Sequence, residues 1–179
     1  LITGDAVGLG RIVGRQMARE ARGATLILTG GSPSGDATRR HLAELEALGA
    51  VAEYRQLDVG DRDDVVRLVR DIPALRGIVH AAGVLRDSLI VNKTEDELRE
   101  VLRAKVAGTL HLDEASRALE LDAFACFASP SGALGHVGQA VFAVASALLA
   151  RFDQLRVGYE RRSRCSHVQS HNILQSPPS

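Results

Sequence analysis

Short apolar and β-branched runs alternate with amphipathic stretches of helical length along most of the chain. Short apolar runs predict strands, and apolar residues that recur at helical spacing predict helices. The predicted strands are Leu1–Thr3, Ala24–Thr29, Val51–Leu57, Gly77–His80 and Asp122–Ala128. The predicted helices are Gly8–Ala21, Asp36–Leu48, Arg62–Ile72, Thr94–Leu119 and Gln139–Arg156. Alternating strands and helices form βαβ units, so the pattern predicts an α/β fold with a Rossmann-like, doubly wound parallel sheet.

The ends of two predicted helices carry local signals. Gly49 follows the helix that contains Leu45, and glycine is the usual residue just beyond a helix end. Thr94 and Glu97 have the spacing of a capping box, in which each side chain binds the other residue's backbone N–H.

The alternating pattern stops near Arg156. Residues 1–156 are predicted to form one domain. Residues 157–179 are rich in Arg, Ser, His, Gln and Pro and are predicted to be a disordered polar tail. The first residues, Leu1–Gly4, look like the end of a core strand, so we expect a domain that is truncated at both ends.

Composition narrows the range of functions. The 179 residues suit one domain, and 22 basic against 22 acidic residues indicate neither nucleic acid nor an anionic membrane as a partner. No apolar stretch approaches the roughly 20 residues of a membrane span. Cys126 and Cys165 are interpreted as thiols in a reducing compartment, which favours the cytoplasm.

A glycine-rich turn follows the first predicted strand. It runs from Thr3 and Gly4 through Gly8, Leu9 and Gly10 into the first helix. Such glycines let the backbone approach a pyrophosphate, which a helix N-terminus then stabilises. The position at the first βα turn favours a dinucleotide site, and the alternative is a tight turn without a ligand.

Two other predicted strands end at residues that fit the same site. Asp58, followed by Val59, can accept a hydrogen bond from an adenine amino group, or it can cap the following helix. Ala81, Ala82 and Gly83 are small enough for a nicotinamide ribose to lie against the backbone. His80 alone is more typical of a structural histidine.

The loop after the second predicted strand lacks a clear cofactor signal. An Arg there would bind a 2′-phosphate and an acid would bind a ribose diol, but this chain has Gly31. The nearest charges are Asp36, Arg39 and Arg40. The choice between NADP and NAD therefore stays open, and weak binding is expected.

These residues together resemble a known family. The Thr3–Gly10 turn, the His80–Gly83 segment, Lys105 and the series Ser129, Phe142 and Ser146 are similar to the short-chain dehydrogenase/reductase superfamily. More narrowly, the chain resembles the ketoreductase domain of modular polyketide synthases over about residues 1–155. A Lys upstream of the Ser, as at Lys105, is typical of these ketoreductases.

The resemblance implies reduction of a β-ketoacyl chain, held on an acyl carrier protein, by NADPH. Acyl carrier protein and neighbouring synthase domains are then the expected partners. The family's lysine and serine fall on Lys105 and Ser129, its proton-donating tyrosine on Phe142, and its asparagine on Ser146. Asp87 matches the family's marker for the D-configured alcohol.

Three departures predict an impaired site. Phe142 has no hydroxyl to donate, Ser146 replaces an amide, and Gly31 removes a phosphate contact. Tyr54 and Tyr159 are expected to lie elsewhere. One hypothesis is therefore an inactive structural or docking domain. The second is an active reductase that relies on Ser129 and Lys105, and the third is a nucleotide-sensing protein without chemistry.

The resemblance also implies elements that the sequence pattern does not predict. The family continues after the last helix with another strand and a substrate-covering lid, whereas this chain continues with a polar tail. We therefore expect the C-terminal strands and the lid to be missing. An exposed sheet edge would make the chain unstable or prone to aggregate.

Overall fold

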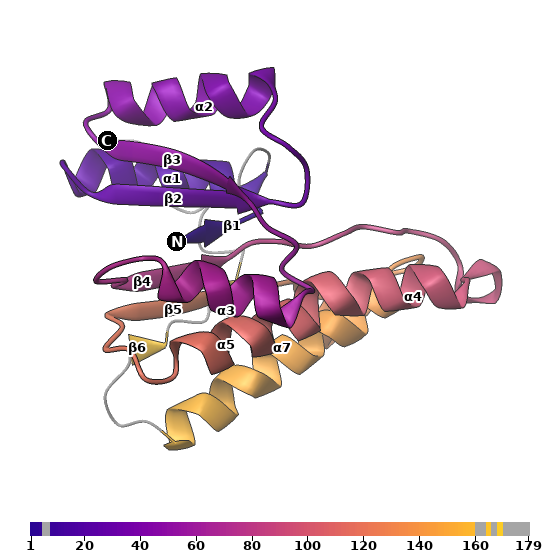
Figure 1. Ribbon diagram of the computed structural model, residues 1–179. Helices are drawn as coiled ribbons and strands as arrows, with labels where there is room; N and C mark the ends of the chain where they lie inside the picture. The colour runs from indigo at the N-terminus through magenta and orange to yellow at the C-terminus, as the bar shows by residue number, and fades with distance from the viewer. Residues whose placement is uncertain (5–7, 160–163, 166–167, 170–179) are drawn as a thin grey trace, which may run out of the picture.

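The computed structural model describes residues 1–4, 8–159, 164–165 and 168–169. Its centre is a parallel sheet in the order β3-β2-β1-β4-β5-β6, the Rossmann strand order (Figure 1). The first five strands are β1 (Ile2–Thr3), β2 (Thr25–Gly30), β3 (Val51–Gln56), β4 (Gly77–His80) and β5 (Ala123–Ala128). The predicted fold class is confirmed, and each predicted strand lies within two residues of its observed bounds.

Helices cover both faces of the sheet. The helices α1 (Leu9–Glu20) and α2 (Asp36–Ala47) pack on one face. The helices α3 (Arg62–Arg70), α5 (Gly108–Ser116) and α7 (Ala140–Tyr159) pack on the other (Figure 1). The chain reverses direction across the sheet after β3, and right-handed crossovers then place the later helices on the opposite face.

Each face has its own apolar core. On the α1/α2 face the buried residues are Ile2, Ala18, Leu26, Leu28, Leu45 and Ala50. On the other face the core includes Ile27, Val65, Ile78, Leu112 and Phe124. Successive strand residues point to opposite faces, so Leu26 and Leu28 belong to the first core and Ile27 to the second.

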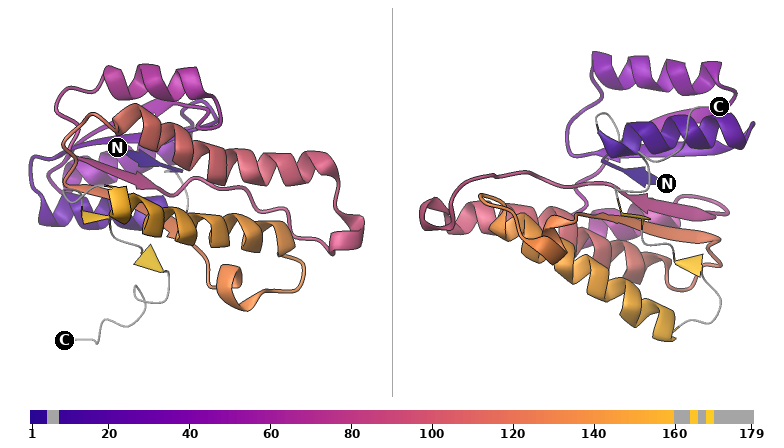
Figure 2. Two further views of the ribbon diagram at one scale, coloured as in Figure 1. Left: turned by 90° about the horizontal axis from the view of Figure 1, so that it is seen from below. Right: turned by 180° about the vertical axis from the view of Figure 1, so that it is seen from behind.

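The long helix predicted over Thr94–Leu119 is interrupted, which corrects the prediction. It consists of α4 (Glu95–Leu102), a π-helical segment η2 (Arg103–Ala107) and α5. The predicted capping box at its start is present. Figure 2 shows α4 and the beginning of α7 projecting together past the strand ends.

A close approach to the sheet accompanies the π segment. A Cβ atom at Gly108 would lie 2.9 Å from Val59 and 3.2 Å from the His80 ring. The Lys105 carbonyl accepts hydrogen bonds from His80 Nε2 (3.3 Å) and Thr109 Oγ1 (2.7 Å). π-Helical turns of this kind often occur at functional sites.

Two short elements complete the connections around the strand ends. They are η1 (Ile90–Asn92), between β4 and α4, and α6 (Ser131–Leu134), between β5 and α7. Gln139 Nε2 donates to Asp87 Oδ2 at 2.9 Å and so ties the segment before α7 to the segment after β4.

Part of the tail that is predicted to be disordered contains strand residues. The helix α7 continues to Tyr159, and β6 (Arg164–Cys165) and β7 (Val168–Gln169) both pair in parallel with β5. The strands β6 and β7 pair with β5 in the same register. Main-chain pairing needs no apolar alternation, and the unpaired edge of β5 offers donors and acceptors. The other tail residues lie outside the described residues.

Candidate active-site cleft

Two adjacent cavities open where the parallel strands end. The larger, of about 370 Å³, is lined by residues at or just after the ends of β1 to β4 and by part of α4 and η2. The smaller, of about 230 Å³, is lined by Leu9, Ala81, Ala82, Gly83, Leu85, Lys105, Phe127, Ala128, Ser129 and Phe142. Ala82 and Gly83 border both cavities. Ligands of open α/β sheets bind at this position, outside the carboxyl ends of the strands.

The glycine turn is shaped by close backbone contact. Gly4 has a φ of 74°, and a Cβ atom there would lie 2.6 Å from the Ala81 carbonyl oxygen. Gly8 precedes α1 with a φ of 73°, while Gly10 is buried within the helix. Thr3 and Gly4 line the larger cavity and Leu9 the smaller, whereas Gly8 and Gly10 line neither. Residues 5–7 lie outside the described residues.

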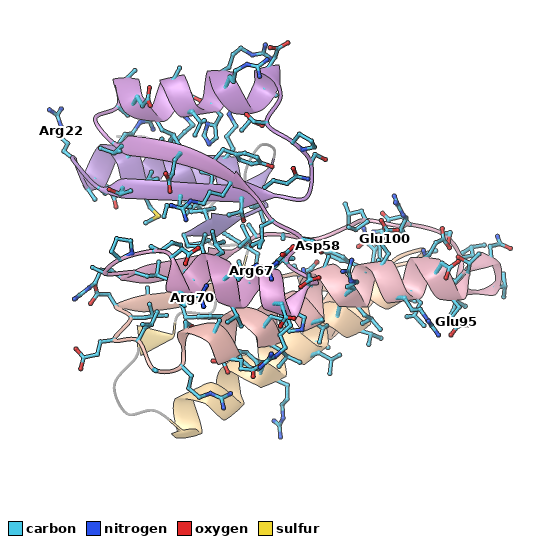
Figure 3. All side chains as sticks on the ribbon, viewed as in Figure 1. Arg22, Asp58, Arg67, Arg70, Glu95 and Glu100 are labelled. Atoms are coloured by element: carbon cyan, nitrogen blue, oxygen red, sulfur yellow. The ribbon has the colours of Figure 1, made fainter. Side chains whose placement is uncertain are left out.

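Asp58 lies at the edge of the larger cavity but is already engaged. One carboxylate oxygen accepts from the Gly60 N–H at 2.9 Å, and the other is 2.8 Å from Arg103 Nη1. Figure 3 shows Asp58 where β3 ends, beside α4. The alternative that Asp58 caps the next helix is wrong. Asp61 caps α3 by accepting from the Asp64 N–H, and this bond holds the pKa of Asp61 below its usual value.

Side chains of β3 hold the loop that follows β2. The Tyr54 hydroxyl lies within hydrogen-bond distance of the Gly30 carbonyl (3.0 Å) and the Ser32 carbonyl. Gln56 Nε2 donates to the Gly31 carbonyl at 3.0 Å. This loop borders the larger cavity through Gly30 and Gly31, so Tyr54 has a structural role away from the smaller cavity.

The charges nearest to this loop bind each other. Arg39 pairs with Asp36 and also contacts the Ser34 carbonyl. Neither Arg39, Arg40 nor Asp36 lines the larger cavity, and open space surrounds the position of a Cβ atom on Gly31. In the described residues, this end of the cavity therefore has no arginine beside the loop.

A buried hydrogen-bond chain links the glycine turn to the π segment. The Ala82 N–H donates to Thr3 Oγ1 at 3.4 Å, and Thr3 Oγ1 is 2.7 Å from His80 Nδ1. The other ring nitrogen lies 3.3 Å from the Lys105 carbonyl. Burial lowers the pKa of His80 to about 4, so the ring is neutral. A neutral ring with its hydrogen on Nε2 satisfies both contacts.

Lys105 lies against the ring of Phe142. Its Nζ is 4.1 Å from the ring centroid, and the residue is 5% exposed. Burial lowers the pKa of Lys105 to about 8, while Cys126 acts in the opposite direction. The face of Phe142 also favours the ammonium form, but this attraction is smaller than the effect of burial. Among the described residues no carboxylate pairs with Lys105.

Ser129 has a defined orientation at the end of β5. Its Oγ accepts from the Ser131 hydroxyl at 2.9 Å and from the Ser131 N–H at 3.3 Å. The Ser129 hydroxyl hydrogen can therefore be donated to another acceptor.

Ser146 lies away from both cavities. It is 1% exposed, and its Oγ has no hydrogen-bond partner within the described part of the chain. The backbone of Gly132 packs closely on it, since a Cβ atom at Gly132 would lie 3.0 Å from Ser146 Cβ. The structure thus brings Lys105, Ser129 and Phe142 to one cavity and leaves Ser146 in the core.

Several residues that line the two cavities were not predicted from the sequence. Arg103 and Glu100 contribute charge to the larger cavity, and Phe127 and Leu85 contribute apolar surface to the smaller. Arg103 gave no sequence signal, because its position depends on the π segment. Phe127 lies in a predicted strand two residues before Ser129, a spacing that indicates a shared face.

A protein-family model, the KR domain, matches residues 1–168. The chain belongs to the ketoreductase (KR) domain family. It is 42% identical over 166 residues to polyketide synthase PksN of Bacillus subtilis, and 40% identical over 169 residues to polyketide synthase ThaG of Burkholderia thailandensis. These matches cover 90% and 91% of this chain but only 3% of either synthase.

Solved structures of the same family share the fold. An N-terminal ketoreductase from the macrolactin assembly line is 36% identical, with a TM-score of 0.90. A ketoreductase domain from the bacillaene assembly line is also 36% identical, with a TM-score of 0.87. Both alignments cover 94% of this chain, and they cover 35% and 42% of the respective structures. The chain therefore spans less than half of either solved ketoreductase.

Two other kinds of site are not found in the described residues. No helix there has both the length and the apolar character to cross a bilayer. No three His, Cys, Asp or Glu side chains there form a group that could hold a metal ion.

Proposed function

We propose that this ketoreductase domain binds a nicotinamide nucleotide but reduces a β-ketoacyl thioester slowly or not at all. The observation that carries the proposal is the position of Phe142, whose ring lies 4.1 Å from Lys105 Nζ in the cavity that also contains Ser129. A ring without a hydroxyl occupies the place from which the family's tyrosine would donate a proton. When bound, NADPH would supply the hydride.

The remaining side chains can perform part of the chemistry. Ser129 can donate a hydrogen bond to a substrate carbonyl, and Lys105 supplies positive charge beside it. Loss of a positioned general acid costs about 10²–10⁴ in rate. Because Phe142 leaves Lys105 without a phenol whose pKa it could lower, we expect the rate of reduction to fall by at least that factor.

Cofactor binding depends on the larger cavity. Gly4, Ala82 and Gly83 leave room for a dinucleotide along the strand ends. Gly31 offers no cation for a 2′-phosphate, and Asp58 is shared with Arg103. We therefore expect weak binding of NADP, with little preference over NAD. An acyl carrier protein in the cytoplasm, with neighbouring synthase domains, is the proposed setting.

The decisive experiment follows NADPH oxidation with a small β-ketoacyl thioester. The parent protein should show no turnover, and Phe142→Tyr should give a small increase, since Ser146 and Gly31 also differ from the family pattern. Phe127→Tyr is the matched control, because it adds a phenol to the same cavity at a different place. Rapid turnover by the parent protein would contradict the proposal.

Two further measurements separate the alternatives. If the parent protein has activity through Ser129 and Lys105, Ser129→Ala should abolish it. Calorimetric titration with NADP and with NAD tests nucleotide binding without chemistry. Heat of binding without turnover supports a silent nucleotide-binding domain, and no heat with either nucleotide contradicts the binding part of the proposal.

A further inference from the structure

Lys105 is an amine in a largely apolar cavity, where Cys126 interacts with it electrostatically and, among the described residues, no carboxylate pairs with it. The cavity of 230 Å³ is otherwise lined by large apolar side chains, by Ser129 and by alanine and glycine, and Lys105 Nζ lies against the Phe142 ring. The large apolar residues are Leu9, Leu85, Phe127 and Phe142. The π segment η2 places this side chain toward the cavity. An amine in such surroundings is more often neutral than an exposed lysine, and only the neutral form has a lone pair for attack.

We infer that Lys105 can act as a nucleophile and form a covalent imine with a carbonyl compound that enters this cavity. The preferred ligand is a small ketone or aldehyde, and the expected natural ligand is the β-keto group of an acyl thioester. The choice of a β-ketoacyl ligand rests on the proposed function, whereas the nucleophilic amine does not.

The step balances without an oxidant or reductant. The Nζ lone pair attacks the carbonyl carbon, and a C–N bond forms. Both hydrogens of the amine leave with the carbonyl oxygen as water, and a C=N bond remains. Ser129 borders the same cavity and can donate its hydroxyl hydrogen to the departing oxygen. Phe142 contributes no competing hydroxyl, and its face shields the amine from solvent.

The other lysine of the chain provides an internal control. The sequence contains two lysines, Lys93 and Lys105. Lys93 Nζ is buried without a hydrogen-bond partner within the described residues, but Lys93 lines neither cavity. If burial alone made a lysine reactive, both would react. If access from the cavity is required, Lys105 should react and Lys93 should not.

The experiment traps the imine on the purified protein. The protein is incubated with the N-acetylcysteamine thioester of acetoacetate and sodium cyanoborohydride, and peptides containing each lysine are then analysed by mass spectrometry. We expect reductant-dependent labelling of Lys105 that exceeds labelling of Lys93 by at least tenfold. Lys105→Arg should remove the label, with circular dichroism to show that the variant is folded.

Other outcomes overturn the inference. Equal labelling of both lysines, or no labelling of Lys105 by any carbonyl probe, would show that the cavity does not create a nucleophile. Labelling without reductant, or by the butyryl thioester that lacks a ketone, would show acyl transfer instead of an imine. These results come from the parent protein, so they hold even if Lys105→Arg does not fold.

A second probe separates this inference from the proposed function. Propionaldehyde tests the amine without assuming a β-ketoacyl ligand. Labelling of Lys105 by propionaldehyde but not by the acetoacetyl thioester supports the nucleophile and contradicts the proposed substrate class. Labelling by both probes, with no NADPH oxidation, supports both proposals.

Discussion

The two cavities of the cleft depend on different features of the chain. We call the larger cavity, proposed to hold the nucleotide, the nucleotide side, and the smaller cavity with Lys105, Ser129 and Phe142 the catalytic side. The nucleotide side uses backbone turns and small residues, such as Gly4 and Ala82, at the ends of β1 and β4. The catalytic side, from β5 to α7, depends on single hydroxyl groups. A site made from backbone geometry survives most substitutions, whereas a site that depends on one phenol would lose its proton donor with a single Tyr-to-Phe difference. If the proposed impairment holds, this contrast would explain how the fold retains a cleft while its chemistry weakens.

The largest expected effect tests the backbone side. Gly4→Ala introduces a Cβ atom 2.6 Å from the Ala81 carbonyl at a φ of 74°. We expect a loss of roughly 2–4 kcal/mol in the free energy of unfolding, together with loss of nucleotide binding. Gly31→Ala is the control, because open space surrounds that position. Chemical denaturation measures the stability of both variants. If Gly4→Ala and Gly31→Ala are equally stable, the close backbone contact at Gly4 does not shape the cleft as described.

A second test uses the buried ring that joins the two sides. The pKa of His80 falls from 6.5 to about 4 on folding, so the unfolded chain binds more protons between these values. Stability should therefore decrease as the pH falls below 6.5, by about 2 kcal/mol at pH 5 from this residue. Denaturation of the parent protein and His80→Asn across this range measures the effect. Parallel stability curves would show that His80 does not contribute.

A smaller effect is expected at Ser146. Its buried Oγ lacks a partner among the described residues, so Ser146→Ala should raise stability by about 1 kcal/mol. Ser146→Asn should lower it, because Gly132 packs against this position. Thermal melting of the two variants checks the prediction. If Ser146→Ala lowers the melting temperature, the hydroxyl has a stabilising contact.

The smallest effect is expected at the ion pair of the larger cavity. Arg103 and Asp58 are about half exposed, with side-chain exposures of 54% and 48%. Arg103→Ala should therefore change the free energy of unfolding by less than about 1 kcal/mol. Nucleotide affinity should rise a few-fold, since Arg103 then no longer competes with the nucleotide for Asp58. Calorimetry at constant salt measures this affinity, and a decrease would show that Arg103 itself binds the nucleotide.

Much of the fold followed from local pattern. The strands, the capping box at Thr94 and the helix end at Gly49 were predicted correctly, because each depends on nearby residues. The strand residues after α7 were missed, since the pairing of Arg164 with β5 depends on an open sheet edge and not on its own sequence. The π segment was missed for a related reason. The contacts at its Lys105 carbonyl come from β4 and from Thr109.

The site was predicted less completely than the fold. Lys105, Ser129 and Phe142 were placed together by the family resemblance, and the structure brings them to one cavity. The partner Arg103 of Asp58 could not be predicted, because it lies on η2, far along the chain from the loop after β3 that carries Asp58. Ser146 was expected beside the other three, but side-chain direction on α7 places it in the core.

The wide turn at Arg103–Ala107 also changes the sequence register between α4 and α5. A π turn holds one residue more than the α-helical turn that it replaces. Deleting a single residue from this segment should therefore restore a uniform α-helix, with α4 and α5 keeping nearly the same orientation. The deletion would remove the wide turn itself, and with it the present position of the Lys105 carbonyl, which accepts from His80 and Thr109. The extra residue thus affects the local shape of the cleft wall more than the course of the helix.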